Sequence, residues 1–208
     1  MATTVLSEHI LPEEGVNQLL KRVALVVVGI VVLGIAAKIK FPLPPSPVPI
    51  TLGTFAVLSL AAAYGPRLGL VTILGYMLIG ALGFDVFAGS SATKSGLTYM
   101  MGGTGGYLVG YVLATLALGL AATRGWDRSP IRMAAAMLIG NVLIYVPGVA
   151  WLYTLVKGGL FDAAKFSTPL DQTLAWGLTP YLIGDGLKLA LAAVLFPVLW
   201  KLVGSARA

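Results

Sequence analysis

The feature that most constrains this chain is a series of apolar runs that approach or exceed the length needed to cross a lipid bilayer. A helix rises 1.5 Å per residue, so about 20 apolar residues span the hydrocarbon core. Six candidate spans follow, at residues 19–39, 50–64, 68–84, 105–122, 131–155 and 174–203. The run at 50–64 is short and needs an extension or shelter from neighbouring helices. A lipid-embedded backbone must satisfy its own hydrogen bonds, so the sequence predicts an all-α, polytopic membrane protein, a compact bundle of six transmembrane helices.

Composition agrees with this class and excludes several kinds of site. Of 208 residues, 58% are hydrophobic and 11% are charged, which is far from the mix of a soluble domain. The chain has no cysteine, and its one histidine, His9, precedes the first span. We therefore expect no metal site and no cysteine or serine–histidine nucleophile. The net charge of +6 comes from basic residues at the ends of spans. This favours membrane anchoring over nucleic-acid binding.

Lysine and arginine predict the orientation of the bundle. With six spans, eight of the fourteen basic residues, including all six arginines, fall on one side, and five lysines fall on the other. The positive-inside rule makes the arginine side cytoplasmic, together with both termini. We expect a polar cytoplasmic lead-in at 1–18, the transmembrane domain at 19–203 and a short C-terminal tail at 204–208.

The three external segments are long and rich in glycine, proline and serine, whereas the cytoplasmic connections are brief. Residues 41–50 contain five prolines, which predicts a stiff, extended strap. Residues 84–111 are rich in glycine, and residues 153–178 are long enough to contain a short helix and to act as a lid. Such loops commonly carry binding function.

Asp185 and Lys188 place two opposite charges inside the last apolar span. Their spacing of three puts both on one helix face. A charge in hydrocarbon costs roughly several kcal/mol, so such residues usually face the bundle interior and serve a site. Pro180 at the first helical position, with Thr179 as its cap, would place the pair near the external end of this helix. The alternative is an ion pair that only neutralises itself. We favour a site for a small ligand that has both hydrogen-bond donors and acceptors.

The segment GGTGGYL at 102–108 offers a second set of candidate contacts. It lacks the GxxxxGK[ST] pattern, so it does not predict ATP binding. Thr104 is expected to cap the following helix, and the first N–H groups of that helix, at Gly105 and Gly106, could hold a ligand oxygen. Gly106 and Gly110 form a GxxxG pattern, which we assign to packing within the bundle rather than to dimerisation.

Aromatic side chains are a third set. One face of the fifth span is partly polar and aromatic, at Asn141, Tyr145, Gly148 and Trp151. Pro147 interrupts this face, which is either core packing around a kink or the wall of a cavity. Similar but individually weaker candidates are Phe87, Tyr99, Tyr107 and Tyr181.

Four motifs in order carry a resemblance to a known family: VPITLGTFAVL at 48–58, FAGSS at 87–91, GGTGGYLVGY at 102–111 and GDGLKLALAA at 184–193. Together they resemble the BioY family, the substrate-capture (S) subunits of energy-coupling-factor (ECF) biotin transporters. The chain departs from the family pattern at three positions. The family usually has glutamine where this chain has Gly53, and proline where this chain has Gly103 and Ile183.

The resemblance implies a six-helix S subunit in the bacterial cell (inner) membrane that binds biotin from outside and needs no bound cofactor. It implies a separate transmembrane coupling (T) subunit and cytoplasmic ATPase subunits as partners. No catalytic residue is expected. Asp185 would accept from a ureido N–H of biotin, while Lys188 would donate to the ureido carbonyl or screen the carboxylate. The expected substrate-binding residues are Phe87, Ala88, Gly89, Ser90, Thr104, Gly105, Gly106, Tyr145, Trp151, Tyr181, Asp185 and Lys188.

Two alternatives stay open at this point. A stand-alone proton- or ion-coupled transporter would use Asp185 as a relay, and an S subunit for another vitamin would use the same fold. An intramembrane enzyme is less favoured, because the predicted spans contain no paired carboxylates or histidines.

Overall fold

The computed structural model describes residues 5–10, 18–41, 50–91 and 93–205. Most of the expected proline-rich strap, part of the N-terminal lead-in and the last three residues of the tail lie outside this range. The elements in chain order are α1 (Leu6–Ile10), α2 (Gln18–Lys38), β1 (Lys40–Phe41), β2 (Ile50–Thr51), α3 (Gly53–Ala81), α4 (Gly96–Met100), α5 (Gly105–Ala122), η1 (Trp126–Arg128), α6 (Pro130–Leu155), η2 (Val156–Leu160), α7 (Pro169–Gly177), η3 (Thr179–Tyr181) and α8 (Leu182–Ser205). The predicted all-α class is confirmed, since the described residues hold only one short antiparallel pair of strands, β1 with β2.

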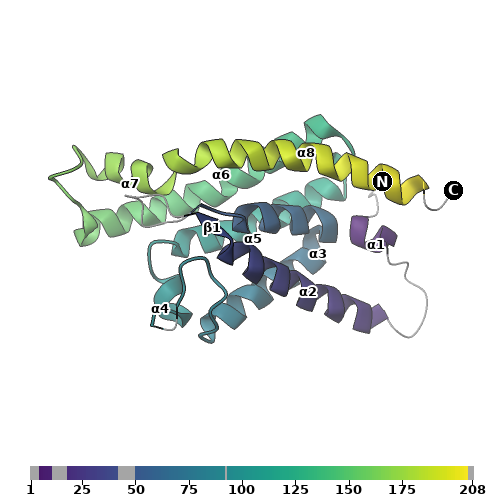
Figure 1. The fold of residues 1–208 in the computed structure, drawn as a ribbon, viewed down its shortest axis with the longest axis horizontal. Coiled ribbons are helices and arrows are strands. Elements are labelled where there is room, and N and C mark those ends of the chain that lie inside the picture. Colours follow the sequence, from purple (N-terminus) through teal and green to yellow (C-terminus); the bar gives the residue numbers. More distant parts are fainter. Residues whose placement is uncertain (1–4, 11–17, 42–49, 92, 206–208) are drawn as a thin grey trace.

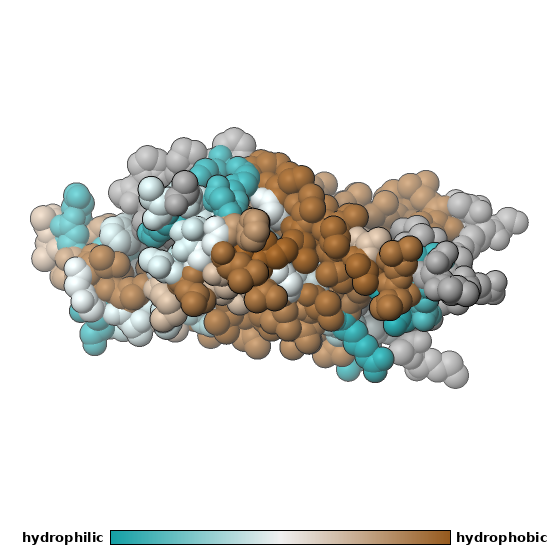
Figure 2. Space-filling model, turned by 90° about the horizontal axis from the view of Figure 1, so that it is seen from below, coloured by the Kyte–Doolittle hydropathy of each residue, from teal (hydrophilic) through white to brown (hydrophobic). Residues whose placement is uncertain are grey.

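Five helical segments of the described chain are long and apolar enough to cross a membrane: Gln18–Lys38, Gly53–Ala81, Gly105–Ala122, Pro130–Leu160 and Pro169–Val203. Figure 1 shows these helices packed along a common direction, with α4, β1 and α7 at the end opposite the two termini. Hydrophobic side chains cover much of the middle of the molecule in Figure 2, and polar side chains lie toward its ends. The structure therefore agrees with a multi-pass membrane protein.

The helix α3 contains a break at Gly65, where φ is 74° and ψ is 179°. Glycine adopts this positive φ without steric cost, and the next residue, Pro66, has no N–H with which to continue the preceding helix. The first residue of α3, Gly53, lies against Ala37 near the end of α2. Asp85, just beyond the other end of α3, pairs with Lys38 in the last turn of α2. The chain therefore reverses direction at Gly65, within the connection predicted at 64–68.

The helices α5 and α6 pack closely because glycines remove side chains between them. A Cβ atom at Gly110 would lie 2.6 Å from the Cα of Ile144, and one at Gly106 would lie 2.3 Å from the carbonyl oxygen of Pro147. Real Cβ atoms do not approach so closely, so both positions require glycine. The prediction that this GxxxG pattern serves packing within the chain is confirmed.

The segment after α6 contains the short helix that its length predicted, α7. Thr168 caps α7 by accepting a hydrogen bond from the N–H of Asp171 at 3.1 Å. The fully buried side chain of Gln172 binds the N–H of Asp162 and the carbonyl of Leu160, both at 2.8 Å. This amide ties α7 to the segment that follows α6.

Two expected helix caps differ from the structure. Thr179 lies inside η3, whose N-cap is Leu178, so the predicted capping role of Thr179 is wrong. Thr179 occupies the first position of the 3₁₀ turn η3, and α8 begins three residues later, at Leu182. Thr104 does occupy the N-cap of α5, but its backbone is helical there and its side chain makes no capping hydrogen bond.

Candidate ligand-binding site

A partly enclosed cavity lies between the helices at the end of the bundle opposite the termini. Its volume is about 770 Å³ when the open space at its mouth is included. The lining comes from α2, α3, α4, α5, α6, α8 and the segments between them. It combines one charged cluster with a series of aromatic rings, an arrangement that suits an apolar ligand with a few polar groups.

The charged cluster is centred on Asp185 and Lys188, near the start of α8. The ammonium of Lys188 donates to Oδ1 of Asp185 and to Oγ1 of Thr54, each at 3.0 Å. The hydroxyl of Tyr145, from α6, donates to Oδ2 of Asp185. Asp185 is only 4% exposed, so these bonds replace the water that a carboxylate needs. Three helices thereby meet at one buried ion pair.

This geometry bears on both interpretations of the charged pair. The two side chains contact each other, as the self-neutralising alternative required. They also line the cavity, as a ligand site requires. An ammonium carries three N–H donors, of which two are used here, and a carboxylate has about four acceptor positions. The pair therefore retains capacity to bind a ligand.

The structure brings most of the predicted site residues to this cavity. Those that line it are Phe87, Ala88, Thr104, Tyr145, Tyr181, Asp185 and Lys188. Those that do not line it are Gly89, Ser90, Gly105, Gly106 and Trp151. The predicted set thus divides into a wall of the cavity and residues packed behind that wall.

Trp151 fixes the turn that precedes α5. Its indole N–H donates to the carbonyl of Gly102 at 2.9 Å. A Cβ atom at Gly105 would lie 3.1 Å from this nitrogen, and one at Gly106 would lie 2.4 Å from the Cβ of Trp151. The two glycines and the indole therefore form the contact between α5 and α6 rather than the cavity lining.

Among the lining residues that sequence reasoning missed are Thr54, Tyr76 and Tyr111. Thr54 contacts both charges, although in the sequence it is one hydroxyl inside an apolar run. Tyr111 had a detectable signal, because Thr104, Tyr107 and Tyr111 recur at the three- and four-residue spacing of one helix face. Tyr76 had no such signal.

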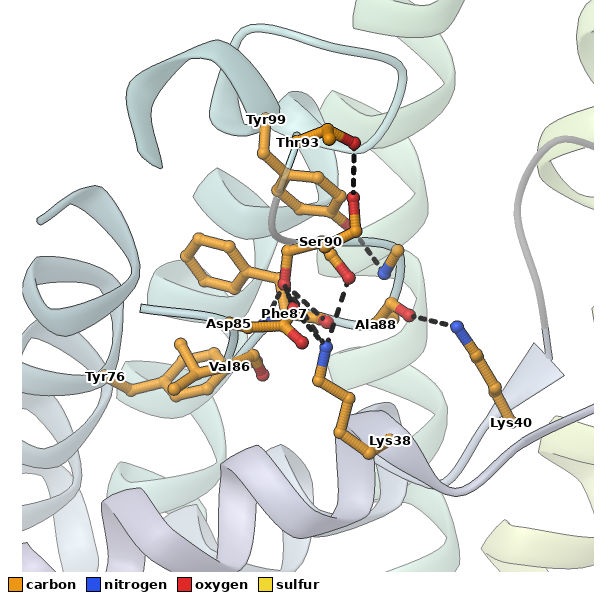
Figure 3. A network of polar contacts seen from close by, with 12 residues as sticks. Lys38, Lys40, Tyr76, Asp85, Val86, Phe87, Ala88, Ser90, Thr93 and Tyr99 are labelled. Carbon is orange, nitrogen blue, oxygen red and sulfur yellow. Dashed lines mark hydrogen bonds and ion pairs between the residues drawn. The ribbon is translucent and has the colours of Figure 1, made fainter. Parts of the chain in front are cut away.

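Phe87 forms an aromatic part of the wall and is 1% exposed. Its ring stacks on Tyr99, with centroids 5.1 Å apart, and meets the ring of Tyr76 edge-on at 5.3 Å. The Phe87 N–H donates to Oγ of Ser90 at 3.0 Å, as Figure 3 shows. Ser90 thus acts behind the wall by fixing the backbone that carries the ring.

The fold and its cavity define a polytopic α-helical membrane protein with a ligand site between its helices. The sequence model of the BioY family matches residues 7–205, almost the whole of the chain. The chain belongs to the BioY family, which confirms the resemblance found in its motifs.

Individual members of the family align with this chain over most of their length. The chain is 31% identical to a probable biotin transporter BioY of Pyrococcus horikoshii over 175 residues, 84% of this chain and 93% of the relative. It is 32% identical to the biotin transporter BioY of Thermotoga maritima over 179 residues, covering 86% and 91% of the two chains. These relatives are described as transporters, which supports a transport role over an enzymatic one.

A solved structure shares the fold. It is the S-component for biotin from an ECF-type ABC transporter, and it superposes with a TM-score of 0.72 over 90% of this chain and 95% of that one. The two sequences are 20% identical, so this similarity establishes the common architecture.

Proposed function

We propose that this chain is the biotin-binding S subunit of an ECF-type vitamin transporter. The observation that carries the proposal is the Asp185–Lys188 pair, which lies in the wall of an aromatic cavity in a chain of the BioY family. Capture of the vitamin is assigned to this chain, and ATP hydrolysis to separate subunits.

The chemistry of biotin fits this cavity. Its ureido ring offers two N–H donors and a carbonyl acceptor, its fused rings are apolar, and its tail ends in a carboxylate. Asp185 accepts from a ureido N–H, and Lys188 donates to the carbonyl or screens the carboxylate. The aromatic wall at Phe87, Tyr145 and Tyr181 covers the apolar rings.

We also propose that the bundle crosses the membrane six times. The reversal at Gly65 supports this count, because it turns α3 into two antiparallel halves that each make one pass. Both termini are then cytoplasmic and the cavity faces the outside. The basic residues around the start of α2, the break in α3, η1 and the end of α8 support this orientation.

The proposed partners are a transmembrane T subunit and cytoplasmic ATPase subunits. Support comes from the solved relative, whose description places it in an ECF-type ABC transporter. The proposed cellular location of the protein is the bacterial cell (inner) membrane. Reconstitution in liposomes separates this proposal from a stand-alone transporter. ATP-dependent uptake only with T and ATPase subunits supports it, whereas gradient-driven uptake by the chain alone contradicts it.

Titration of biotin onto the purified chain tests the site. We expect saturable binding by the wild type, and a loss of affinity of about tenfold or more for Asp185→Asn and for Lys188→Met, because each leaves a buried polar partner unsatisfied. Asp162→Asn and Lys165→Met are matched controls. Asp162 and Lys165 form an ion pair with the same spacing and the same 3.0 Å contact, but in an exposed segment.

Equal affinity in the wild type and both site variants would remove Asp185 and Lys188 from the site. Absence of biotin binding by the wild type would contradict the proposed ligand. Mass spectrometry of the small molecule that copurifies with the chain would then identify the vitamin that it does bind.

A further inference from the structure

A second polar network lies at the mouth end of the bundle, separate from Asp185 and Lys188 (Figure 3). It joins Lys38, in the last turn of α2, to the segment Asp85–Ser91, which we call the wall loop. The ammonium of Lys38 lies 2.5 Å from Oδ1 of Asp85, 3.3 Å from the carbonyl oxygen of Ser90 and 3.4 Å from Oγ of Ser90. The hydroxyl of Ser90 lies 2.6 Å from the same carboxylate oxygen. Hydrogen bonds from Lys38 and Ser90 hold the pKa of Asp85 below its usual range.

The wall loop delivers two residues, Phe87 and Ala88, to the cavity lining. Its backbone is also held from α3 and α4, because the hydroxyl of Tyr76 donates to the carbonyl of Val86 at 3.0 Å and the N–H of Gly89 donates to the hydroxyl of Tyr99 at 3.1 Å. These two bonds fix the wall loop to α3 and α4, the helices that precede and follow it in the chain. Lys38 adds the ion pair that fixes it to α2.

The attachment to α2 is important because α2 is the least buried of the candidate spans. Within the protein, 17% of its apolar window is buried, compared with 22% for Pro169–Val203, 39% for Pro130–Leu160 and 50% for α3 and for α5. An element with few buried contacts separates from its neighbours at low free energy. The side chains of Lys38 and Asp85 are 33% and 53% exposed, so water competes for their ion pair. Such a contact can open and close without unfolding the bundle.

We propose that Lys38 is a positioning residue of the ligand site. Through Asp85 and Ser90 it holds the wall loop closed, so that Phe87 and Ala88 stay against the bound ligand, and opening of this contact lets the ligand leave. The inference rests on the proposed ligand-binding function. It adds a role for Lys38, a residue that does not itself line the cavity.

The dissociation rate of tritiated biotin, chased with excess unlabelled biotin, tests the role of Lys38. Lys38→Met and Asp85→Asn are each expected to raise this rate by about three- to fivefold, the size typical of a partly exposed ion pair. The double variant should dissociate no faster than the faster single variant, because both changes remove the same contact. The charge-swapped variant, Lys38→Asp with Asp85→Lys, restores the ion pair but not the contact of Lys38 with the Ser90 carbonyl, so its rate should lie between those of the wild type and Lys38→Met.

Two measurements keep the test decisive. Lys165→Met removes a lysine of an exposed ion pair that does not touch the wall loop, and it should leave the dissociation rate unchanged. Hydrogen exchange needs no ligand. Lys38→Met should increase exchange at the amides of Phe87 and Gly89, both of which donate hydrogen bonds within or next to the wall loop, and should leave α7 unchanged.

The outcomes separate the two proposals. If the wild type binds biotin, but Lys38→Met and Asp85→Asn alter neither dissociation nor exchange, the positioning role is wrong and the proposed function stands. Failure of the charge swap to slow dissociation also contradicts the role. If the wild type does not bind biotin, the proposed function is wrong, and the exchange measurement alone decides whether Lys38 holds the loop.

Discussion

A single methyl group at Gly80 tests how tightly the structure holds the Phe87 wall. A Cβ atom there would lie 2.1, 2.3 and 2.8 Å from Cζ, Cε2 and Cε1 of Phe87. Carbon–carbon contacts are about 3.5–4.0 Å, so the ring in Gly80→Ala would have to move by roughly 1.5 Å. The stack with Tyr99 and the edge contact with Tyr76 oppose this movement.

Overpacking of this kind costs about 1–3 kcal/mol of folding stability. A displaced ring also changes the cavity wall, so we expect biotin affinity to fall by about tenfold, which corresponds to about 1.4 kcal/mol. Thermal unfolding of the detergent-solubilised chain measures the first effect, and biotin titration measures the second.

The matched control is Gly158→Ala, because a Cβ atom at Gly158 meets no atom within 4 Å. We expect its effect on stability to lie within about 0.5 kcal/mol. In a Phe87→Ala background, Gly80→Ala should cost almost nothing, because the clashing ring is gone. An equal cost of Gly80→Ala with and without that ring would refute the reasoning.

Three further predictions concern contacts around the cavity and at the opposite end of the bundle. Tyr107→Phe removes the 2.8 Å bond from the tyrosine hydroxyl to the carbonyl of Gly177 and should lower unfolding stability by about 1 kcal/mol. An unchanged unfolding midpoint would contradict a stabilising role for this bond. Gln172→Ala leaves two backbone groups after α6 without their partner, so hydrogen exchange there should rise while exchange in α5 stays constant. Burial raises the pKa of Asp127, and the indole of Trp200 opposes this with one 2.6 Å bond. Folding therefore favours the protonated carboxyl, and the contribution of this group to stability falls as pH rises from the unfolded value of about 3.9 through the raised pKa. Asp127→Asn should flatten this part of the pH profile of unfolding, and an unchanged slope would contradict the assignment.

The sequence predicted the features that depend on local properties. Hydrophobic length predicted the long apolar helices, and the cost of a charge in hydrocarbon predicted that Asp185 and Lys188 face a cavity. The interruption between the apolar runs 50–64 and 68–84 predicted a short connection there, and the structure has its break in α3 at Gly65, inside that connection. None of these inferences needs knowledge of neighbouring helices.

Features that depend on helix rotation were harder to predict. Tyr145 and Trp151 were grouped on one face, but six residues at about 100° each place them roughly 120° apart around the helix. Accordingly, Tyr145 contacts α8 while Trp151 contacts the turn before α5. Thr54 was missed for a related reason, since only the packing of α3 against α8 shows that its hydroxyl contacts both charges.

The carboxylate of Asp185 has consequences for selectivity, because the protein's own hydroxyl and ammonium groups already occupy it. A ligand can bond to the acceptor and donor positions that these groups leave free, or it can exchange with one of the resident donors. A molecule that can both give and take hydrogen bonds completes this exchange evenly and keeps the benefit of burying its apolar rings. A molecule that cannot do so strands a polar group, at a cost of about 1–3 kcal/mol. The pocket therefore selects its ligand chiefly through the free-energy cost of binding molecules that leave a polar group unsatisfied. This selectivity does not require a high affinity for the matching ligand.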